Sequence, residues 1–159
     1  MEATRLIGNR REQQSVRLWL ELLRCAKLQE QRLGSRMKKA FGHSLTRFDV
    51  LSQLYRSEGS TLPVTALADK LLASASRNIT GLVDRMVDDG LVERRANPDD
   101  RRSFTISLTD RGRAVFEEMA REHARWVAGG FEGLSQGELK SLQSTMISLR
   151  EHLEQGGEA

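Results

Sequence analysis

Two arginines, Arg101 and Arg102, stand at the end of a turn of Asn, Pro and Asp residues that joins two short strand-like segments. The whole stretch, residues 91–109, predicts a β-hairpin. A polar, cationic hairpin tip is poorly suited to packing in a core and well suited to contacting a polyanion. Arg101 would enter a minor groove, where negative potential is focused. The other arginines of the hairpin would meet phosphates; these are Arg94, Arg95 and Arg102.

A helix is predicted over residues 75–89, immediately before the hairpin, with Ser74 as its N-cap. Its first turns are polar and its later turns are apolar. A recognition helix has this gradient, because its N-terminal end enters the major groove with hydrogen-bonding side chains aimed at base edges. The residues expected at the DNA are Ser74, Ser76, Arg77, Asn78, Thr80 and Gly81. Polar residues also collect at helix N-termini simply as caps, so the adjacent hairpin is what favours DNA binding.

Two carboxylates in the hairpin turn, Asp99 and Asp100, would repel DNA. We interpret Asp100 as the partner of an arginine, because a bidentate carboxylate–guanidinium pair fixes the direction of the arginine. The alternative for this turn is a solvated hairpin of mixed charge. A helix followed by a basic β-hairpin is the sequence shape of a winged helix. A winged helix that binds protein and never DNA is a further alternative, although its hairpin would tend to lose the basic tip.

The composition limits the class of protein. With 159 residues the chain is long enough for one domain and a helical extension. The single cysteine, Cys25, excludes an internal disulfide and a cysteine zinc site. The histidines lack metal-ligand spacing and no phosphate loop is present, so we predict no enzyme, metal site or cofactor. No apolar run approaches ~18 residues, so we expect no membrane span and a cytoplasmic location.

Charge is distributed unevenly along the chain, although the net charge is only +3. Residues 1–47 carry 11 Lys and Arg against 4 Asp and Glu, whereas residues 114–159 carry 4 against 8. This asymmetry fits a molecule with one anion-facing side, and ordinary solvated helix faces are the alternative.

Apolar periodicity and end signals predict helices along the rest of the chain. They cover residues 11–41 with Gly42 as the stop, 46–57 with Thr46 as the cap, 64–72 after Pro63, and 110–129 with Asp110 as the cap. A last helix begins near Ser135, because Ser135 and Glu138 have the spacing of a capping box. The expected fold is therefore mainly α with a small β-hairpin.

Two of these helices carry apolar surface that one domain leaves unexplained. Helix 11–41 is apolar on more than one face, so it needs partners on more than one side. The last helix repeats apolar residues at spacings of a heptad seam. The seam consists of Leu139, Leu142, Met146, Leu149 and Leu153. A seam this short is also compatible with packing on one neighbouring helix.

The segment Asp100-Arg101-Arg102, followed after five residues by Leu108-Thr109-Asp110-Arg111-Gly112, resembles the D-x-R…L-T-x-x-G signature of the MarR family of bacterial transcriptional regulators. Further similarity to the recognition helix, the following strand and the preceding helix of that family lies at residues 79–86, 89–92 and 67–71. Two positions depart from the pattern. Ala73 stands where many members have Gly, and Pro63 stands where Ser or Thr is common.

The resemblance implies a winged helix-turn-helix with N- and C-terminal dimerisation helices. Its DNA-binding domain would span residues 45–111, its dimerisation region residues 11–41 and 112–155, and a flexible tail residues 156–159. A homodimer would set two recognition helices about one DNA turn apart on a pseudo-palindromic operator in double-stranded DNA. Members of the family are usually repressors that are released by a small molecule or by thiol oxidation.

The family's effector pocket lies between the dimer helices and the DNA-binding lobe. Segments 18–25 and 45–49 look similar to those of members associated with aromatic-compound degradation, so the expected effector is an aromatic carboxylate or its CoA thioester. The residues expected in the pocket are apolar (Trp19, Leu23, Phe48, Trp126) or able to meet an anion (Arg17, Arg24, His43, Arg47). Core packing is the alternative for Trp19 and Phe48, and a satisfied polar position near a helix end is the alternative for His43.

Oxidation of Cys25 is the alternative signal. A redox sensor needs an exposed thiolate and usually a resolving partner. Arg24 and Lys27 are close in sequence, but the chain has no second cysteine, which favours a structural role for Cys25.

Overall fold

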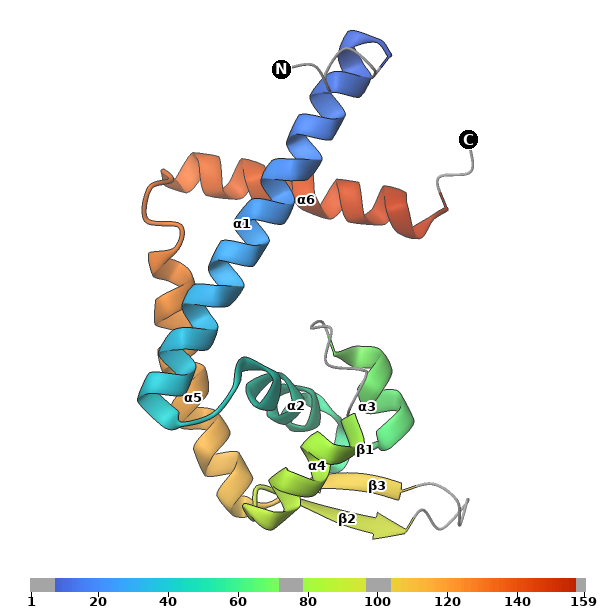
Figure 1. The fold of residues 1–159 in the computed structure, drawn as a ribbon, viewed down its shortest axis with the longest axis vertical. Helices are drawn as coiled ribbons and strands as arrows, with labels where there is room; N and C mark the ends of the chain where they lie inside the picture. Colours follow the sequence, from blue (N-terminus) through green and yellow to red (C-terminus); the bar gives the residue numbers. More distant parts are fainter. Residues whose placement is uncertain (1–7, 72–78, 97–103, 157–159) are drawn as a thin grey trace. The chain divides into compact units, whose positions relative to one another are not determined.

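The structure is a computed structural model that describes residues 8–71, 79–96 and 104–156 (Figure 1). Helices predominate, and one small antiparallel sheet accompanies them, as the sequence predicts. The chain divides into two compact units, Met1–His123 and Ala124–Ala159. The elements are α1 (Arg10–Phe41), α2 (Leu45–Arg56), the 3₁₀ turn η2 (Glu58–Ser60), β1 (Thr61–Pro63), α3 (Val64–Lys70), α4 (Ile79–Asp88), β2 (Val92–Ala96), β3 (Phe104–Leu108), α5 (Asp110–Gly129) and α6 (Gln136–Glu154).

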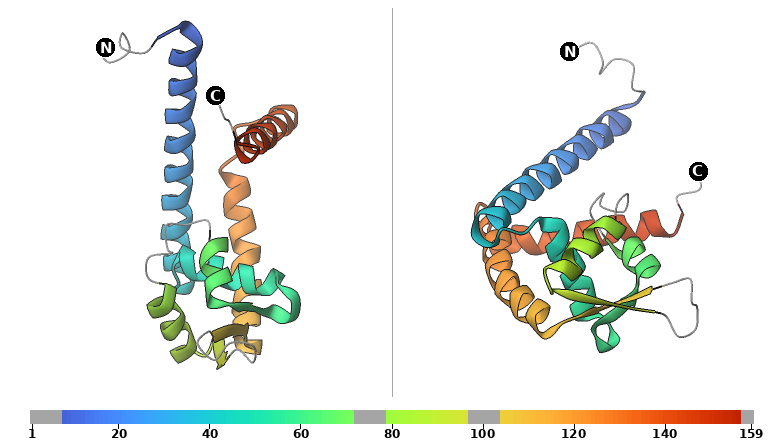
Figure 2. Two further views of the ribbon diagram at one scale, coloured as in Figure 1. Left: turned by 90° about the vertical axis from the view of Figure 1, so that its right-hand side faces the viewer. Right: turned by 60° about the horizontal axis from the view of Figure 1, so that its bottom comes forward.

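Helix α1 is long and begins and ends at local signals. Asn9 caps its N-terminus in a capping box with Glu12. Its end at Gly42 is confirmed, because Gly42 is left-handed with a φ of 71° and its N–H bonds the Lys38 carbonyl at 3.0 Å. Figure 2 shows α1 as one unbroken helix. Only Leu33 and Met37, near its C-terminal end, are buried within the chain.

Two predicted helix caps are wrong, by two positions at α2 and by one position at α5. Helix α2 begins at Leu45, and the cap is the hydroxyl of Ser44, which accepts a hydrogen bond from the Arg47 N–H, so Thr46 lies inside the first turn. At α5 the hydroxyl of Thr109 accepts a hydrogen bond from the Gly112 N–H at 2.9 Å. Asp110 is therefore the first helical residue rather than the cap. In the first turn its negative charge still interacts favourably with the helix dipole.

The hairpin predicted at 91–109 is present as β2 and β3, and a third strand joins it. Strand β1 pairs with β3 on the side opposite β2, so that the order is β1-β3-β2. Strand β1 is not predicted from the sequence, in which Pro63 indicates only a helix start. Pro63 serves both elements, because it ends an edge strand and occupies the N-cap position of α3.

The core of the first unit lies between the small sheet and its helices. Helix α2 contacts β1 and β3, and α4 contacts β2. Fully buried side chains come from α2, α3, α4, β2 and β3 and from the residue that precedes β2; they are Val50, Leu51, Leu54, Leu67, Val83, Met86, Leu91, Val92 and Ile106. This shared core holds α4 and the hairpin on one rigid support.

The second unit contains the end of α5 and all of α6. The capping box of Ser135 and Glu138 is confirmed, with the Ser135 N–H bonded to the Glu138 carboxylate at 2.9 Å. No residue of α6 is buried, and the seam residues Leu142, Met146 and Leu153 are exposed. Most of the tail predicted at 156–159 lies outside the described residues.

Candidate nucleic-acid interface

The described part of α4 has one buried face and one exposed face. Its apolar residues Ile79, Leu82, Val83 and Met86 are buried. Thr80, Asp84 and Arg85 are exposed, and the Arg85 Nε donates to the Gly81 carbonyl at 3.0 Å. Thr80 and Gly81 lie in the first turn of α4 as the structure describes it. The other residues expected to read DNA, Ser74, Ser76, Arg77 and Asn78, lie outside the described residues.

A glycine turn leads from α4 into the hairpin. Gly90 has a φ of 67°, its N–H bonds the Val87 carbonyl, and the Leu91 N–H bonds the Met86 carbonyl, both at 2.9 Å. This pair of hydrogen bonds is a Schellman motif, which needs a residue that tolerates a left-handed backbone. The predicted stop at Gly90 is confirmed.

The arginines of β2 have different surroundings. Arg94 forms an ion pair with Asp84 of α4 at 3.2 Å, and its guanidinium lies 4.5 Å from the ring centroid of Phe104. The Arg95 side chain is 67% exposed and pairs with Glu93 at 2.5 Å. Arg94 therefore connects the hairpin with α4, whereas Arg95 faces solvent. The tip residues Asp100, Arg101 and Arg102 lie outside the described residues, and so does the predicted pairing of Asp100 with an arginine.

The base of the hairpin is closed by Thr109. Its hydroxyl donates toward the carbonyl oxygens of Gly90 and Leu91, at 2.8 and 3.0 Å, and accepts from the Gly112 N–H. Gly112 itself is buried against the backbone of Leu91. The threonine and glycine of the L-T-x-x-G segment thus join the end of α4, the start of β2 and the start of α5.

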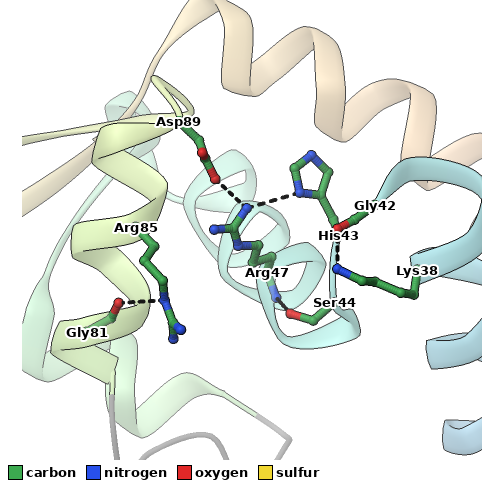
Figure 3. A network of polar contacts seen from close by, with 8 residues as sticks. All are labelled: Lys38, Gly42, His43, Ser44, Arg47, Gly81, Arg85 and Asp89. Carbon is green, nitrogen blue, oxygen red and sulfur yellow. Dashed lines mark hydrogen bonds and ion pairs between the residues drawn. The ribbon is translucent and has the colours of Figure 1, made fainter.

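A polar network lies where α1, α2 and the end of α4 meet (Figure 3). The Arg47 Nη1 contacts the Asp89 Oδ2 at 2.5 Å and the His43 Nδ1 at 3.2 Å. Lys38 donates to the Gly42 carbonyl at 2.9 Å. Burial lowers the pKa of His43, and the Arg47 charge lowers it further, so neutral imidazole is favoured and Nδ1 can accept from the guanidinium.

This network changes the interpretation of Arg47. Arg47 is predicted from the sequence to meet an anionic effector, but in the structure its guanidinium is engaged by the Asp89 carboxylate. His43 and Arg47 do lie together, as expected. An external anion would have to compete with Asp89 for the same guanidinium.

An aromatic cluster lies between α2 and α5. The Phe48 ring is 5.5 Å from that of Phe116 and 4.4 Å from that of His123, measured between centroids. Tyr55 contacts Phe116 at 4.7 Å. Burial lowers the pKa of His123, which suits an imidazole packed on a phenyl ring. Phe48 therefore has a packing role in the first unit, and it stands next to Arg47 in sequence.

The remaining residues expected in the effector pocket are distributed along the chain. Trp19 and Leu23 are exposed on α1, where the Trp19 side chain is 58% accessible. Arg17 is also exposed on α1, and Arg24 pairs with Glu21 at 2.7 Å. Cys25 is an exposed free cysteine on the same helix. Trp126 belongs to the second unit.

Two features of the described residues bear on other functions. Among them, no group of three His, Cys, Asp or Glu side chains forms a potential metal site. Within the same residues, no helix is both long and apolar enough to cross a membrane.

Sequence reasoning missed the partners of the arginines. Asp84, Asp89 and Phe104 each position an arginine that the sequence analysis singled out. For Asp89 a signal was available. Asp88 and Asp89 stand at the C-terminal end of a helix, where the dipole disfavours negative charge, and such a position indicates a partner elsewhere in the chain.

Comparison with known proteins places the chain among regulators. The MarR family profile matches residues 44–104. The HTH-type transcriptional regulator YkoM of Bacillus subtilis (strain 168) is 33% identical over 107 residues, which cover 67% of this chain and 68% of YkoM. The transcriptional repressor YetL of the same organism is 30% identical over 70% of this chain and 66% of its own length. The chain thus spans about two thirds of each of these relatives.

Solved structures extend the similarity to nearly the whole chain. The structure of Sco3205, a MarR family transcriptional regulator from Streptomyces coelicolor in complex with DNA, has a TM-score of 0.76 and 29% identity. The match covers 96% of this chain and 92% of Sco3205. The winged-helix architecture, the matched profile and these relatives agree, and the chain belongs to the MarR family of DNA-binding transcriptional regulators.

Proposed function

We propose that the protein is a homodimeric repressor that binds a pseudo-palindromic operator through α4 and the hairpin. The observation that carries this proposal is the ion pair between Arg94 of β2 and Asp84 of α4, which ties the hairpin to the exposed face of the helix. The polar N-terminal end of α4 and the arginines of the hairpin then form one reading unit. DNA in the structure of Sco3205 and the name of YetL as a repressor support this assignment.

The dimer part of the proposal rests on exposed apolar side chains. On α1, Leu18, Trp19 and Leu28 are each more than half exposed, and on α6 Leu153 is 66% exposed. Large apolar surface of this kind marks an interface in a soluble protein. A second copy of the chain is the partner we propose, and it would place two recognition helices on one face of the DNA.

The effector part of the proposal rests on Phe48 and the neighbouring network. An aromatic ring could pack near Phe48 while its carboxylate, or the phosphates of a CoA thioester, meets His43 and Arg47. Such an anion would displace Asp89 from Arg47 and change how the end of α4 is held. The proposed direction is release of DNA.

Binding to duplex DNA is the first test. The fragment to use is a sequence selected by the protein from a randomised pool, at several salt concentrations. We expect affinity to fall steeply with salt, because each phosphate contact releases counterions. Absence of binding even at low salt would remove the operator-binding proposal and favour a protein-interaction role.

The effector is tested by thermal shift with aromatic acids and their CoA thioesters. A ligand that binds the folded state raises the melting temperature by mass action. Each hit is then added to the protein–DNA complex, and release of DNA is the expected result. A screen without hits would overturn this effector class and leave Cys25 oxidation as the signal to test with a peroxide.

A further inference from the structure

We propose that the Arg47–Asp89 ion pair positions the recognition helix, so that both residues set DNA affinity without contacting DNA. The inference rests on the proposed role of α4 as the recognition helix. Arg47 lies in the first turn of α2 and Asp89 directly follows the last residue of α4, 42 residues later in the chain. The pair is therefore a tertiary link between the support of the domain and the element that reads DNA (Figure 3).

Arg47 is well anchored. Its side chain is only 17% exposed, and its Nη1 also donates to the His43 Nδ1. The rest of α2 is fixed by Val50, Leu51 and Leu54, whose side chains are fully buried. The Arg47 guanidinium is therefore held in place by α2 and His43, and it offers α4 a hydrogen-bond donor at a fixed position.

Asp89 stands where the local structure disfavours it. The C-terminal end of a helix carries partial negative charge, and Asp88 adds a second carboxylate there. Helix stability alone would favour Lys or Arg at these positions. The Asp89 side chain is 46% exposed but points at Arg47, which gives this carboxylate a function that its own helix does not explain.

The other contacts of α4 are less directional. Leu82, Val83 and Met86 bury the inner face of the helix, and apolar packing permits small rotations and shifts along the axis. An ion pair with a hydrogen-bonded guanidinium fixes direction as well as distance. A second polar link, from Arg94 to Asp84, lies about one turn before the end of α4. Together the two links determine how the N-terminal end of α4 is aimed.

Whether replacing Asp89 weakens or strengthens DNA binding distinguishes a positioning role from simple electrostatics. Replacing a carboxylate on a DNA-binding domain by an amide removes repulsion of phosphate, so electrostatics alone predicts equal or tighter binding. A positioning role predicts weaker binding in spite of the more favourable charge. Asp88→Asn is the matched control, because it removes the same charge from the neighbouring residue at the same helix end.

The experiment measures affinity for a duplex that the wild-type protein has selected from a randomised pool. Four proteins are compared with wild type: Asp89→Asn, Arg47→Gln, the double variant and Asp88→Asn. We expect Asp89→Asn and Arg47→Gln each to weaken binding about tenfold, the scale of a coupled polar pair. The double variant should lose no more than either single variant, because both remove the same link. Asp88→Asn should bind at least as tightly as wild type.

The salt dependence of affinity distinguishes a positioning role from a direct contact with phosphate. The slope of log affinity against log salt should equal that of wild type in both single variants, whereas loss of one phosphate contact lowers it by about 0.9. Wild-type affinity in Asp89→Asn, additive losses in the double variant, or a reduced slope in Arg47→Gln would each overturn the positioning role.

A readout without DNA separates this inference from the proposed function. Amide hydrogen exchange over residues 85–91 should become faster in the free Asp89→Asn protein and stay unchanged in Asp88→Asn. If the wild-type protein bound no duplex, the operator proposal would fail, and the exchange data alone would decide whether the pair fixes α4. Unchanged exchange in Asp89→Asn would overturn the inference whatever the DNA result.

Discussion

The carbonyl oxygen of Leu91 lies directly against the Cα of Gly112, so that a Cβ at Gly112 would be 1.9 Å from this oxygen. The hydroxyl of Thr109 bonds the same carbonyl and the Gly112 N–H. Backbone at the start of the hairpin and backbone at the start of α5 are thus held at a distance that only glycine permits. This contact explains physically why the segment from Leu108 to Gly112 needs both its threonine and its glycine.

Gly112→Ala should destabilise the first unit. The methyl group meets backbone rather than a flexible side chain, so α5 and the hairpin must move apart, at a cost of roughly 1–3 kcal/mol. Urea denaturation followed by circular dichroism measures the change. Gly137→Ala is the control, because nothing lies within 4 Å of a Cβ there and alanine favours a helix. Equal stability of Gly112→Ala and wild type would contradict the contact.

Arg101→Ala should weaken operator binding by about 1–3 kcal/mol, because a side chain in the minor groove contributes affinity that depends on DNA shape. Oligomeric state and melting temperature should stay as in wild type. Fluorescence anisotropy with the selected duplex and with an unrelated duplex measures the loss. An unchanged affinity would remove the hairpin tip from DNA binding.

Arg95→Ala tests a different kind of contact on the same hairpin. Its side chain is exposed on β2, so we expect it to meet phosphate. Binding should then weaken about equally on selected and unrelated DNA, and the salt slope should fall by about 1. Loss confined to the selected duplex would show that Arg95 reads sequence instead.

Stability should fall as the solution becomes acidic through the range where histidine titrates. The folded-state pKa values of His43 and His123 both lie below the ordinary 6.5, chiefly because of burial. At His43 the charges of Arg47, Lys38 and Arg111 add to this effect and Asp89 opposes it, whereas at His123 Asp49 opposes it. The unfolded chain therefore binds protons first, and the free energy of unfolding decreases as pH falls below about 7.

Urea denaturation at about pH 7.5 and at about pH 5.5 measures this loss of stability. The two pH values lie on either side of the pKa of histidine in the unfolded chain. His43→Gln and His123→Gln should each make the difference between the two pH values smaller. His152→Gln, at an exposed position of α6, serves as the control. Greater stability at the lower pH would be incompatible with the two depressed pKa values.

Much of the fold follows from local signals in the sequence, and the two wrong caps and the missed strand have separate causes. Helix ends were predicted well where one residue type dominates, as at Gly42 and Gly90, or where two residues cooperate, as at Ser135 and Glu138. The predicted caps are wrong where two candidate residues lie within two positions of each other, because only the backbone decides which side-chain oxygen reaches the free N–H. Strand β1 was missed because three residues that include a proline carry no alternation pattern.

The candidate site was less predictable than the fold. The residue types on the hairpin and α4 indicated DNA binding, but the contacts that hold them join distant segments. Arg47 and Asp89 are 42 residues apart, and Thr109 reaches Gly90 across the whole hairpin. Contacts between such distant residues leave no periodic pattern in the local sequence. The conflict between Asp89 and the helix dipole is the kind of local inconsistency that points to them.

Leu28→Glu should dissociate the proposed dimer. The Leu28 side chain is 59% exposed on α1 in the single chain, and an interface through this helix would bury it in both copies. Burial of one leucine contributes roughly 1.5–3 kcal/mol, so loss at two symmetric positions should raise the dimer dissociation constant by at least about a hundredfold.

Sedimentation equilibrium measures the dimer constant, and operator binding should fall in parallel because two half-sites are no longer joined. Gln31→Glu places the same charge on an exposed polar position of the same helix and should leave the dimer intact. A Leu28→Glu protein that stayed dimeric would exclude this part of α1 from the interface. A wild-type protein that sedimented as a monomer would instead remove the dimer itself, and operator binding would then have to be explained by single copies.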